Sequence, residues 1–294
     1  MEKELLEELE RAVQEFNKSI PSIQRDLLNR VLEIAKDLHI KGGNIKASVK
    51  NLKQLNRVKA ELDKIIITPE YQSSVGEFAK AFNTVSKIQN TYFATLTEEF
   101  TVTAVLDEIK RLSIEETVAS LTEEGLSANV TNKIYEVLSE NVKSGSRWVD
   151  MNKEIRNFIA GNEETAGVLE RYSGQITTDA INEFSANYTQ IVTEDLGLKW
   201  SVYAGSLVEG SRDLCKELIN HHYIHESEIP GFLKGEIGNK KIPVNPKTNL
   251  PYGMKAGTTK DNFRQKRGGH QCNHQMIPVA ESFVPKEIRE KFEE

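Results

Sequence analysis

The most constraining feature of this sequence is the spacing of its apolar residues over the first 66 positions. They recur every three or four residues, the period of one face of an α-helix. Pro21 stands where a new helix could begin, and the glycines within residues 39–44 allow a turn after a helix end. We therefore expect two or three helices here, packed either as a coiled-coil-like arm or as a plain bundle. The apolar positions are Leu5, Leu9, Val13, Phe16, Ile20, Ile23, Leu27, Val31, Ile34, Leu38, Ile45, Val49, Leu52, Leu55, Leu62 and Ile65.

Helical periodicity continues to about Gly197. Thr68 is a predicted N-cap, with Pro69 in the first turn of the helix that follows. Charged residues make up 28% of the chain and aromatic residues only 7%, which favours amphipathic helices over a compact sheet-based enzyme. We expect almost no strand before residue 198.

The pattern changes at residue 198. Trp200, Val202 and Tyr203 lie among β-forming residues, and from Pro230 onward prolines and glycines interrupt the chain every few residues. The predicted fold is mainly α, with a long helical N-terminal region and a small loop-rich α+β C-terminal module. The expected domains are a helical arm or bundle over residues 1–98, a helical domain over 99–197 and the module over 198–294.

Residues capable of binding metal are concentrated in this module. Five of the six histidines and both cysteines lie between positions 215 and 274, and residues 268–274 read GGHQCNH. Zinc binds sulfur and nitrogen donors in a tetrahedron, and a module with a thin apolar core gains stability from such a site. We predict a structural zinc site with Cys215, His270, Cys272 and His274 as its candidate ligands.

The ligand set is left open by the spacing of these residues. A turn at Gly268–Gly269 or at Asn273 would bring two of the three residues in the GGHQCNH segment to Cys215, and a histidine from positions 221–225 is a further candidate. The spacing does not match the paired knuckles of a zinc finger or ribbon. A disulfide between the two cysteines and a polar loop without any joint role are the alternatives.

Catalytic motifs are scarce. The chain has no Gly-rich phosphate loop, no nucleophile elbow and no HExxH sequence. Residues 220–222, which read NHH, and Glu226 resemble the histidine and asparagine chemistry of small metal-dependent nucleases. We therefore expect a protein that is not an enzyme, with a metal-dependent nuclease as the rival interpretation.

Charge is distributed unevenly along the chain. Residues 234–267 contain nine lysines or arginines against two acidic residues, although the formal net charge of the whole chain is -6. Such a segment can contact nucleic acid or an acidic protein surface, or serve only to keep the protein in solution. The acidic start of the chain does not resemble a signal peptide, and no stretch approaches the roughly 18 apolar residues of a membrane span. We expect neither export nor contact with a membrane.

Residues 120–280 contain a distinctive succession of motifs. A helix with a T…A.N pattern is followed by a tryptophan, an Arg-Asp-x-Cys stretch and a terminal His/Cys motif before a proline. The residues are Thr178, Ala180, Asn182, Trp200, Ser211, Arg212, Asp213, Cys215, His270, Cys272, His274 and Pro278. This succession resembles the phage minor head proteins of the Mu F-like head-morphogenesis family. The sequence departs from that family at Asn273 and His274, where the family has Arg and Cys.

The resemblance implies a minor structural protein of a tailed-phage virion. Such a protein is associated with the portal and the capsid interior, near the portal vertex, and aids head assembly and DNA packaging or ejection; it is present in the host cytoplasm during assembly. The implied partners are the portal protein or the major capsid protein, together with packaged DNA through residues 234–267. Arg212 and Asp213 are expected to orient the module as a buried pair.

Overall fold

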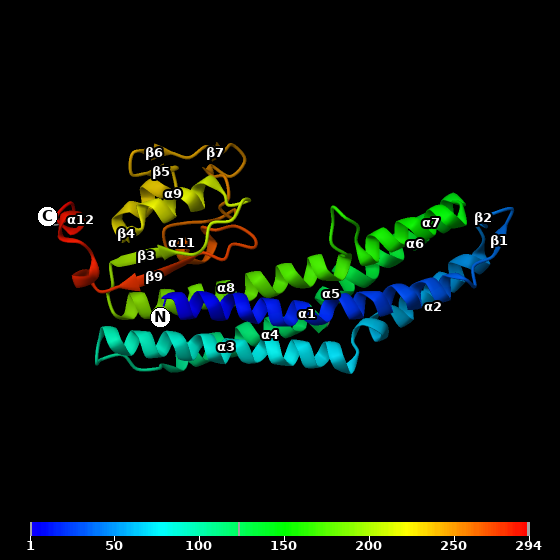
Figure 1. The fold of residues 1–294 in the computed structure, drawn as a ribbon, viewed down its shortest axis with the longest axis horizontal. Helices are drawn as coiled ribbons and strands as arrows, with labels where there is room; N and C mark the ends of the chain where they lie inside the picture. The colour runs from blue at the N-terminus through cyan, green and yellow to red at the C-terminus, as the bar shows by residue number, and fades with distance from the viewer. Residues whose placement is uncertain (1, 123, 293–294) are drawn as a thin grey trace. The chain divides into compact units, whose positions relative to one another are not determined.

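The computed structural model describes residues 2–122 and 124–292, and this part of the chain is mainly α-helical (Figure 1). A few short antiparallel strands lie near the C-terminal end, so the predicted fold class is confirmed. The α-helices are α1 (Glu2–Ala35), α2 (Val49–Ile66), α3 (Pro69–Leu96), α4 (Ala104–Thr122), α5 (Glu124–Leu126), α6 (Asn132–Ser144), α7 (Trp148–Ala160), α8 (Val168–Asp195), α9 (Asp213–His221), α10 (Ile229–Phe232), α11 (Phe263–Lys266) and α12 (Lys286–Arg289).

The remaining elements are short. One π-helix, η1 (Ser127–Thr131), joins α5 to α6, and two 3-10 helices are η2 (Glu226–Glu228) and η3 (Glu281–Phe283). The strands are β1 (Ile40–Lys41), β2 (Asn44–Ile45), β3 (Trp200–Ala204), β4 (Tyr223–His225), β5 (Glu236–Ile237), β6 (Lys240–Lys241), β7 (Val244–Asn245), β8 (Leu250–Pro251) and β9 (Gln275–Val279).

The chain divides into two compact units that are discontinuous in sequence. Unit 1 comprises Met1–Arg11, Ala81–Ile114 and Thr178–Glu294, and unit 2 comprises Ala12–Lys80 and Glu115–Thr177. Helices α1, α3, α4 and α8 each contribute residues to both units, so the division does not follow the expected boundaries after residues 98 and 197. The module expected over residues 198–294 lies entirely in unit 1.

Pro21 does not begin a new helix, contrary to the prediction, because α1 continues through it. A proline inside a helix removes one backbone hydrogen bond and costs about 3 kcal/mol. The apolar face nevertheless stays continuous across it, since Phe16, Ile20, Ile23 and Leu27 are all buried. Packing of this face in unit 2 outweighs the local cost of the proline.

The predicted turn between residues 39 and 44 is a tight β-hairpin in unit 2. Strands β1 and β2 pair antiparallel, and Gly42 and Gly43 between them have φ values of 60° and 79°. Two consecutive left-handed residues are what a two-residue hairpin of this twist requires, and glycine adopts them without strain. The buried side chain of Asn51 at the start of α2 accepts from His39 N at 2.8 Å and donates to Lys46 O at 2.8 Å. The sequence pattern predicts the turn, but not these two-residue strands.

The start of α3 agrees with the predicted cap. Tyr71 N donates to Thr68 Oγ1 at 3.2 Å, and the helix begins at Pro69. The Tyr71 side chain packs edge-on against Phe16, and its hydroxyl donates to Leu121 O at 2.9 Å. Tyr71 thereby connects α3 to α1 and α4 inside unit 2.

Unit 1 contains a three-stranded antiparallel sheet in the order β4-β3-β9 (Figure 1). All five residues of the central strand β3 are buried. The ring of Tyr203 packs in one core cluster with apolar side chains of α9, β4, α10, β5, α11 and β9 and with Ile242, which follows β6. Its buried members are Tyr203, Leu214, Leu218, Ile224, Ile229, Phe232, Ile237, Ile242, Phe263 and Met276.

Helix α8 contacts β9 through polar side chains. Gln275 Nε2 donates to Asn182 Oδ1 at 2.7 Å, and Tyr92 on α3 donates through its hydroxyl to Pro278 O at 2.6 Å. The strand that follows the GGHQCNH segment is thus held by α3 and α8 as well as by β3. Within the described residues, none of the helices combines the length and the apolar character that crossing a bilayer requires.

Candidate metal centre

Three of the four predicted metal ligands come together in unit 1. Cys215 lies on α9, Cys272 lies in the loop before β9, and His274 immediately precedes that strand. One potential ligand atom from each lies within 4.8 Å of the other two. Cys215 and His274 are buried, with 2% and 8% exposed, and Cys272 is partly buried. These three residues, which we call the Cys-Cys-His group, could hold a metal ion.

The distances in the Cys-Cys-His group suit a tetrahedral ion. Two sulfur ligands, each about 2.3 Å from zinc, lie about 3.8 Å apart in a tetrahedron, and a sulfur and a nitrogen ligand lie about 3.6 Å apart. The two Sγ atoms are 4.0 Å apart, and Cys272 Sγ is 3.6 Å from His274 Nδ1. Both cysteines are free thiols, whereas a disulfide would need a separation of about 2.05 Å. The geometry fits shared metal ligation with little movement of the side chains.

Strand pairing explains why residues so far apart in sequence meet. β9 pairs with β3 from Trp200↔Val279 to Ala204↔Gln275, which places His274 just beyond the end of the ladder. Helix α9 packs on the same strand β3 and presents Cys215 from its first turn. Local sequence spacing does not encode this register, so only the clustering of His and Cys predicted the site.

His270 lies outside the Cys-Cys-His group, so its predicted place in the ligand set is not supported. Its ring Nδ1 is 2.9 Å from Asp179 Oδ2 on α8, and the backbone N of Gln271 donates to Asp179 Oδ1 at 2.7 Å. Gln271 has a φ of 56°, which interrupts the extended conformation that would place positions 270, 272 and 274 on one side. The left-handed conformation of Gln271 directs His270 toward α8 instead of toward Cys215.

Tyr203 and Arg267 surround the Cys-Cys-His group. The ring of Tyr203 stacks on His274 with centroids 5.5 Å apart, and its hydroxyl is 3.8 Å from Cys215 Sγ. The Arg267 guanidinium lies 5.1 Å from the centre of the Tyr203 ring and donates to His274 O at 2.7 Å. Both residues are buried; the stacked Tyr203 ring restricts the orientation of the imidazole, and Arg267 holds the backbone of His274.

The two thiols have different proton affinities. The hydrogen-bond contact between the two sulfurs, with further contributions from His274 and Arg267, lowers the pKa of Cys272. The same hydrogen bond and burial raise the pKa of Cys215. Metals bind thiolates, so Cys272 is the sulfur already disposed to coordinate a cation.

Arg212 supports the loop in a way that differs from the prediction. Its guanidinium donates to Gly268 O and to His270 O, each at 2.8 Å. Asp213 is exposed and pairs with Lys216 at 3.3 Å, so the expected buried Arg212–Asp213 pair is wrong. Arg212 is the extended N-cap residue of α9, and its side chain reaches the loop carbonyls instead of Asp213.

The histidines of positions 221–225 do not join the Cys-Cys-His group. His221 Nε2 is 2.8 Å from Glu228 Oε1, and His225 Nδ1 is 2.7 Å from Ser227 Oγ. His222 is exposed, with a φ of 65° at the end of α9. In the described part of the chain, no second set of three His, Cys, Asp or Glu residues converges as closely.

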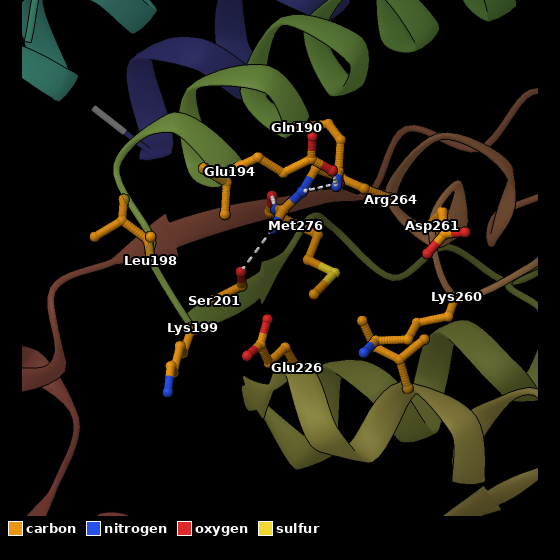
Figure 2. A pocket seen from close by; sticks show the side chains of 13 residues that line it. Gln190, Glu194, Leu198, Lys199, Ser201, Glu226, Lys260, Asp261, Arg264 and Met276 are labelled. Carbon is orange, nitrogen blue, oxygen red and sulfur yellow. Dashed lines mark hydrogen bonds between the residues drawn. The ribbon is translucent and has the colours of Figure 1, made fainter.

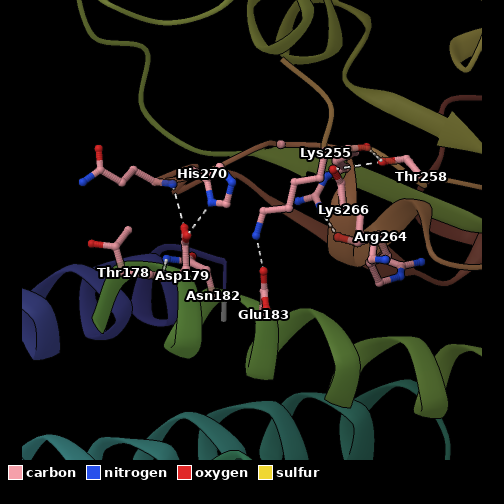
Figure 3. A network of polar contacts seen from close by, with 12 residues as sticks. Thr178, Asp179, Asn182, Glu183, Lys255, Thr258, Arg264, Lys266 and His270 are labelled. Atoms are coloured by element: carbon pink, nitrogen blue, oxygen red, sulfur yellow. Dashed lines mark hydrogen bonds and ion pairs between the residues drawn. The ribbon is translucent and has the colours of Figure 1, made fainter. Parts of the chain in front are cut away.

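Part of the basic segment serves the fold. Arg264 and Arg267 are buried, and Lys255 forms an ion pair with Glu183 on α8. Figure 3 shows Lys255 directed at Glu183 and His270 directed at Asp179, so the loop is fastened to α8 at two points. The exposed cations that remain are Lys234, Lys240, Lys241, Lys247 and Lys260.

The chain was compared with protein-family models, curated proteins and solved structures. No family model matches the chain, and neither the curated proteins nor the solved structures compared with it give a match. The sequence pattern did not identify three residues that contact the site or its loop, namely Tyr203, Arg267 and Asp179. Tyr203 stood out only as a β-forming residue, and the contacts of Arg267 and Asp179 arise from tertiary packing.

Proposed function

We propose that the Cys-Cys-His group binds one zinc ion that clips the GGHQCNH loop to α9. The proposal is carried by two distances that suit a tetrahedral site: 4.0 Å between the two Sγ atoms and 3.6 Å from Cys272 Sγ to His274 Nδ1. Two thiolates and an imidazole favour zinc over magnesium or calcium, which prefer oxygen ligands. Zinc would replace the shared proton of the two cysteines.

The surroundings favour a structural site over a catalytic one. The cavity that Cys272 and His274 help to line measures about 20 Å³, room for roughly one water molecule. A water there would supply the fourth ligand, as it does in open zinc sites, but the cavity has no room for a substrate beside it. The nuclease alternative places its chemistry at positions 220–226, where His221 and His225 are paired with Glu228 and Ser227.

For the whole chain we propose a non-catalytic role as a minor head protein of a tailed phage. Two observations support it: the resemblance described above, and the convergence of the two segments that carry it. Arg212 and Cys215 come from one segment, and Gly268, Cys272 and His274 come from the other, and they meet in one site. The partners in this role are the portal protein or the major capsid protein, and the location is the virion near the portal vertex.

Packaged DNA is the second proposed partner. The exposed lysines of the basic segment, and not its buried arginines, would contact phosphates without regard to sequence. Binding of this kind weakens steeply as salt rises. The same lysines could instead contact an acidic surface of the portal protein, in which case DNA binding would be absent.

The test of this role begins with the genes beside the coding sequence. We expect a portal or terminase gene adjacent to the coding sequence. The portal protein encoded there should co-purify with the chain after co-expression. The chain should also be detected in purified particles. Absence from particles together with failure to retain the portal protein would refute the role, while zinc binding would be judged separately.

Metal-dependent DNA cleavage that His222→Ala abolishes would favour the nuclease instead.

A further inference from the structure

A second cavity in unit 1 is separate from the Cys-Cys-His group. It measures about 330 Å³ and lies between the C-terminal end of α8, strand β3, the η2–α10 segment and the residues that lead into α11 (Figure 2). This volume is at the lower end of the range typical of small-molecule sites. Its lining includes no cysteine or histidine.

Arg264 is the buried charged residue of this cavity. It is 5% exposed, and its Nε donates to Gln190 Oε1 at 3.1 Å. One terminal nitrogen donates to Ser201 Oγ at 3.1 Å and the other to Met276 O. Figure 2 shows the side chain held between Gln190 and Ser201. A guanidinium has five N–H donors, so these three bonds leave one donor on each terminal nitrogen.

The charge of Arg264 has no direct counterion in the described residues. Among residues 2–122 and 124–292, no carboxylate lies within ion-pair distance of its guanidinium, and all three acceptors are neutral. Burial and the nearby Arg267 lower the pKa of Arg264 to about 9, and Glu194 acts in the opposite direction. A buried cation without a paired anion is costly, and an anion in the cavity would remove that cost.

The rim of the cavity carries both signs of charge. Lys199 and Lys260 are exposed there, together with the carboxylates of Glu194, Glu226 and Asp261. The lysines would attract an anion toward Arg264. The three carboxylates would repel a polyanion such as nucleic acid or a nucleoside triphosphate. The rim therefore favours a small molecule with a single anionic group.

We propose that this cavity binds a small molecule through one oxyanion group, a carboxylate or a phosphate, with Arg264 as its anchor. The guanidinium keeps two donors for the oxygens of such a group, and arginine binds both kinds of anion well. Lys199 and Lys260 add attraction at the rim. Gln190 and Ser201 hold the guanidinium in place and do not contact the ligand in this arrangement.

The probe is inorganic phosphate, and separately acetate, titrated into the full chain at constant ionic strength. Met276 lines the cavity whereas Met151 is buried in unit 2, so methionine-methyl NMR reports the site with an internal control. The Met276 signal, assigned with Met276→Leu, should shift and saturate while that of Met151 stays fixed. Saturation by phosphate alone assigns a phosphate group, by acetate alone a carboxylate, and by both the shared oxyanion chemistry. No saturable shift with either probe would overturn the proposal.

Substitutions test the anchor and the rim. Arg264→Gln should weaken probe binding about tenfold or more, the usual size of a lost charge-assisted hydrogen-bond pair. Undiminished binding by a folded Arg264→Gln protein would overturn the proposal. Because that variant removes buried hydrogen bonds and can fail to fold, Lys199→Gln combined with Lys260→Gln is the second test. It should weaken binding at least severalfold, whereas Lys247→Gln, an exposed lysine outside the cavity, should not. Equal binding by the double variant and the parent would also overturn it.

Discussion

At the scale of single residues, the Cys-Cys-His group leaves no room for a side chain at position 268. A Cβ atom there would lie 2.3 Å from Cys272 Sγ and 2.6 Å from its Cβ. The glycine is needed for close approach and not for its backbone conformation. A side chain at position 268 would therefore displace Cys272.

Gly268→Ala should destabilise the protein by about 1–3 kcal/mol, the usual cost of forcing an extra carbon into a packed site. Thermal unfolding measures this loss, and metal content should fall with it. Gly210→Ala is the matched control, because a Cβ at that position meets nothing within 4 Å. Equal melting of the two variants would show that the loop can shift at no cost, against the close packing described for Cys272.

His270 and His274 provide a second comparison between neighbouring residues. His274→Asn should lower zinc affinity more than the roughly 10–100-fold that loss of an outer-shell partner causes, because a direct ligand is removed. His270→Asn should leave the affinity unchanged, since that ring contacts Asp179. Competition with a chromophoric chelator measures both affinities. Equal losses in the two variants would return His270 to the ligand set.

At the scale of elements, the sheet β4-β3-β9 depends on contacts with helices that are distant in sequence. Tyr92 on α3 reaches β9 through its bond to Pro278 O, and burial raises the pKa of this phenol to about 12. The hydroxyl is therefore a neutral donor at any ordinary pH. Its bond joins α3 to the strand that follows the Cys-Cys-His group.

Tyr92→Phe should reduce the free energy of unfolding by about 1 kcal/mol, because it leaves a partly buried carbonyl without its donor. Chemical denaturation measures the change. Tyr252→Phe, at a side chain that is 54% exposed, should have no measurable effect. If Tyr92→Phe also had no effect, water would have to replace the hydroxyl, and the contact between α3 and β9 would be incidental.

Periodicity predicts the helices well because it reflects burial of one face, and that signal extends over many residues. It could not predict that α1 passes through Pro21, where packing of Phe16 to Leu27 overrides the local rule. At the candidate metal centre, the clustering of His and Cys identified the three residues that come together, Cys215, Cys272 and His274. The exclusion of His270 depends on the left-handed Gln271 and on Asp179, and neither is visible in the local spacing.

At the scale of the whole molecule, the candidate metal centre belongs to only one of the two compact units. All three of its residues lie in the Thr178–Glu294 part of unit 1, and unit 2 contributes none. The core around Tyr203 and Phe232 lies in the same part of the chain. Removal of the metal should therefore act first on residues 198–294.

A zinc chelator should make residues 198–294 sensitive to protease while residues 12–80 and 115–177 stay resistant. Limited proteolysis with mass mapping of the first cuts measures this directly. Addition of excess zinc should restore protection, which separates metal loss from nonspecific damage. First cuts distributed evenly over both units would mean that the site does not stabilise the module in particular.

The most direct test of the central claim is the metal content of the purified protein, measured by elemental analysis alongside Cys272→Ser. The account predicts about one zinc per chain in the parent and almost none in the variant, because that substitution removes the thiolate that bridges the group. A parent protein that carries no metal, and takes up none when zinc is supplied under reducing conditions, would contradict it.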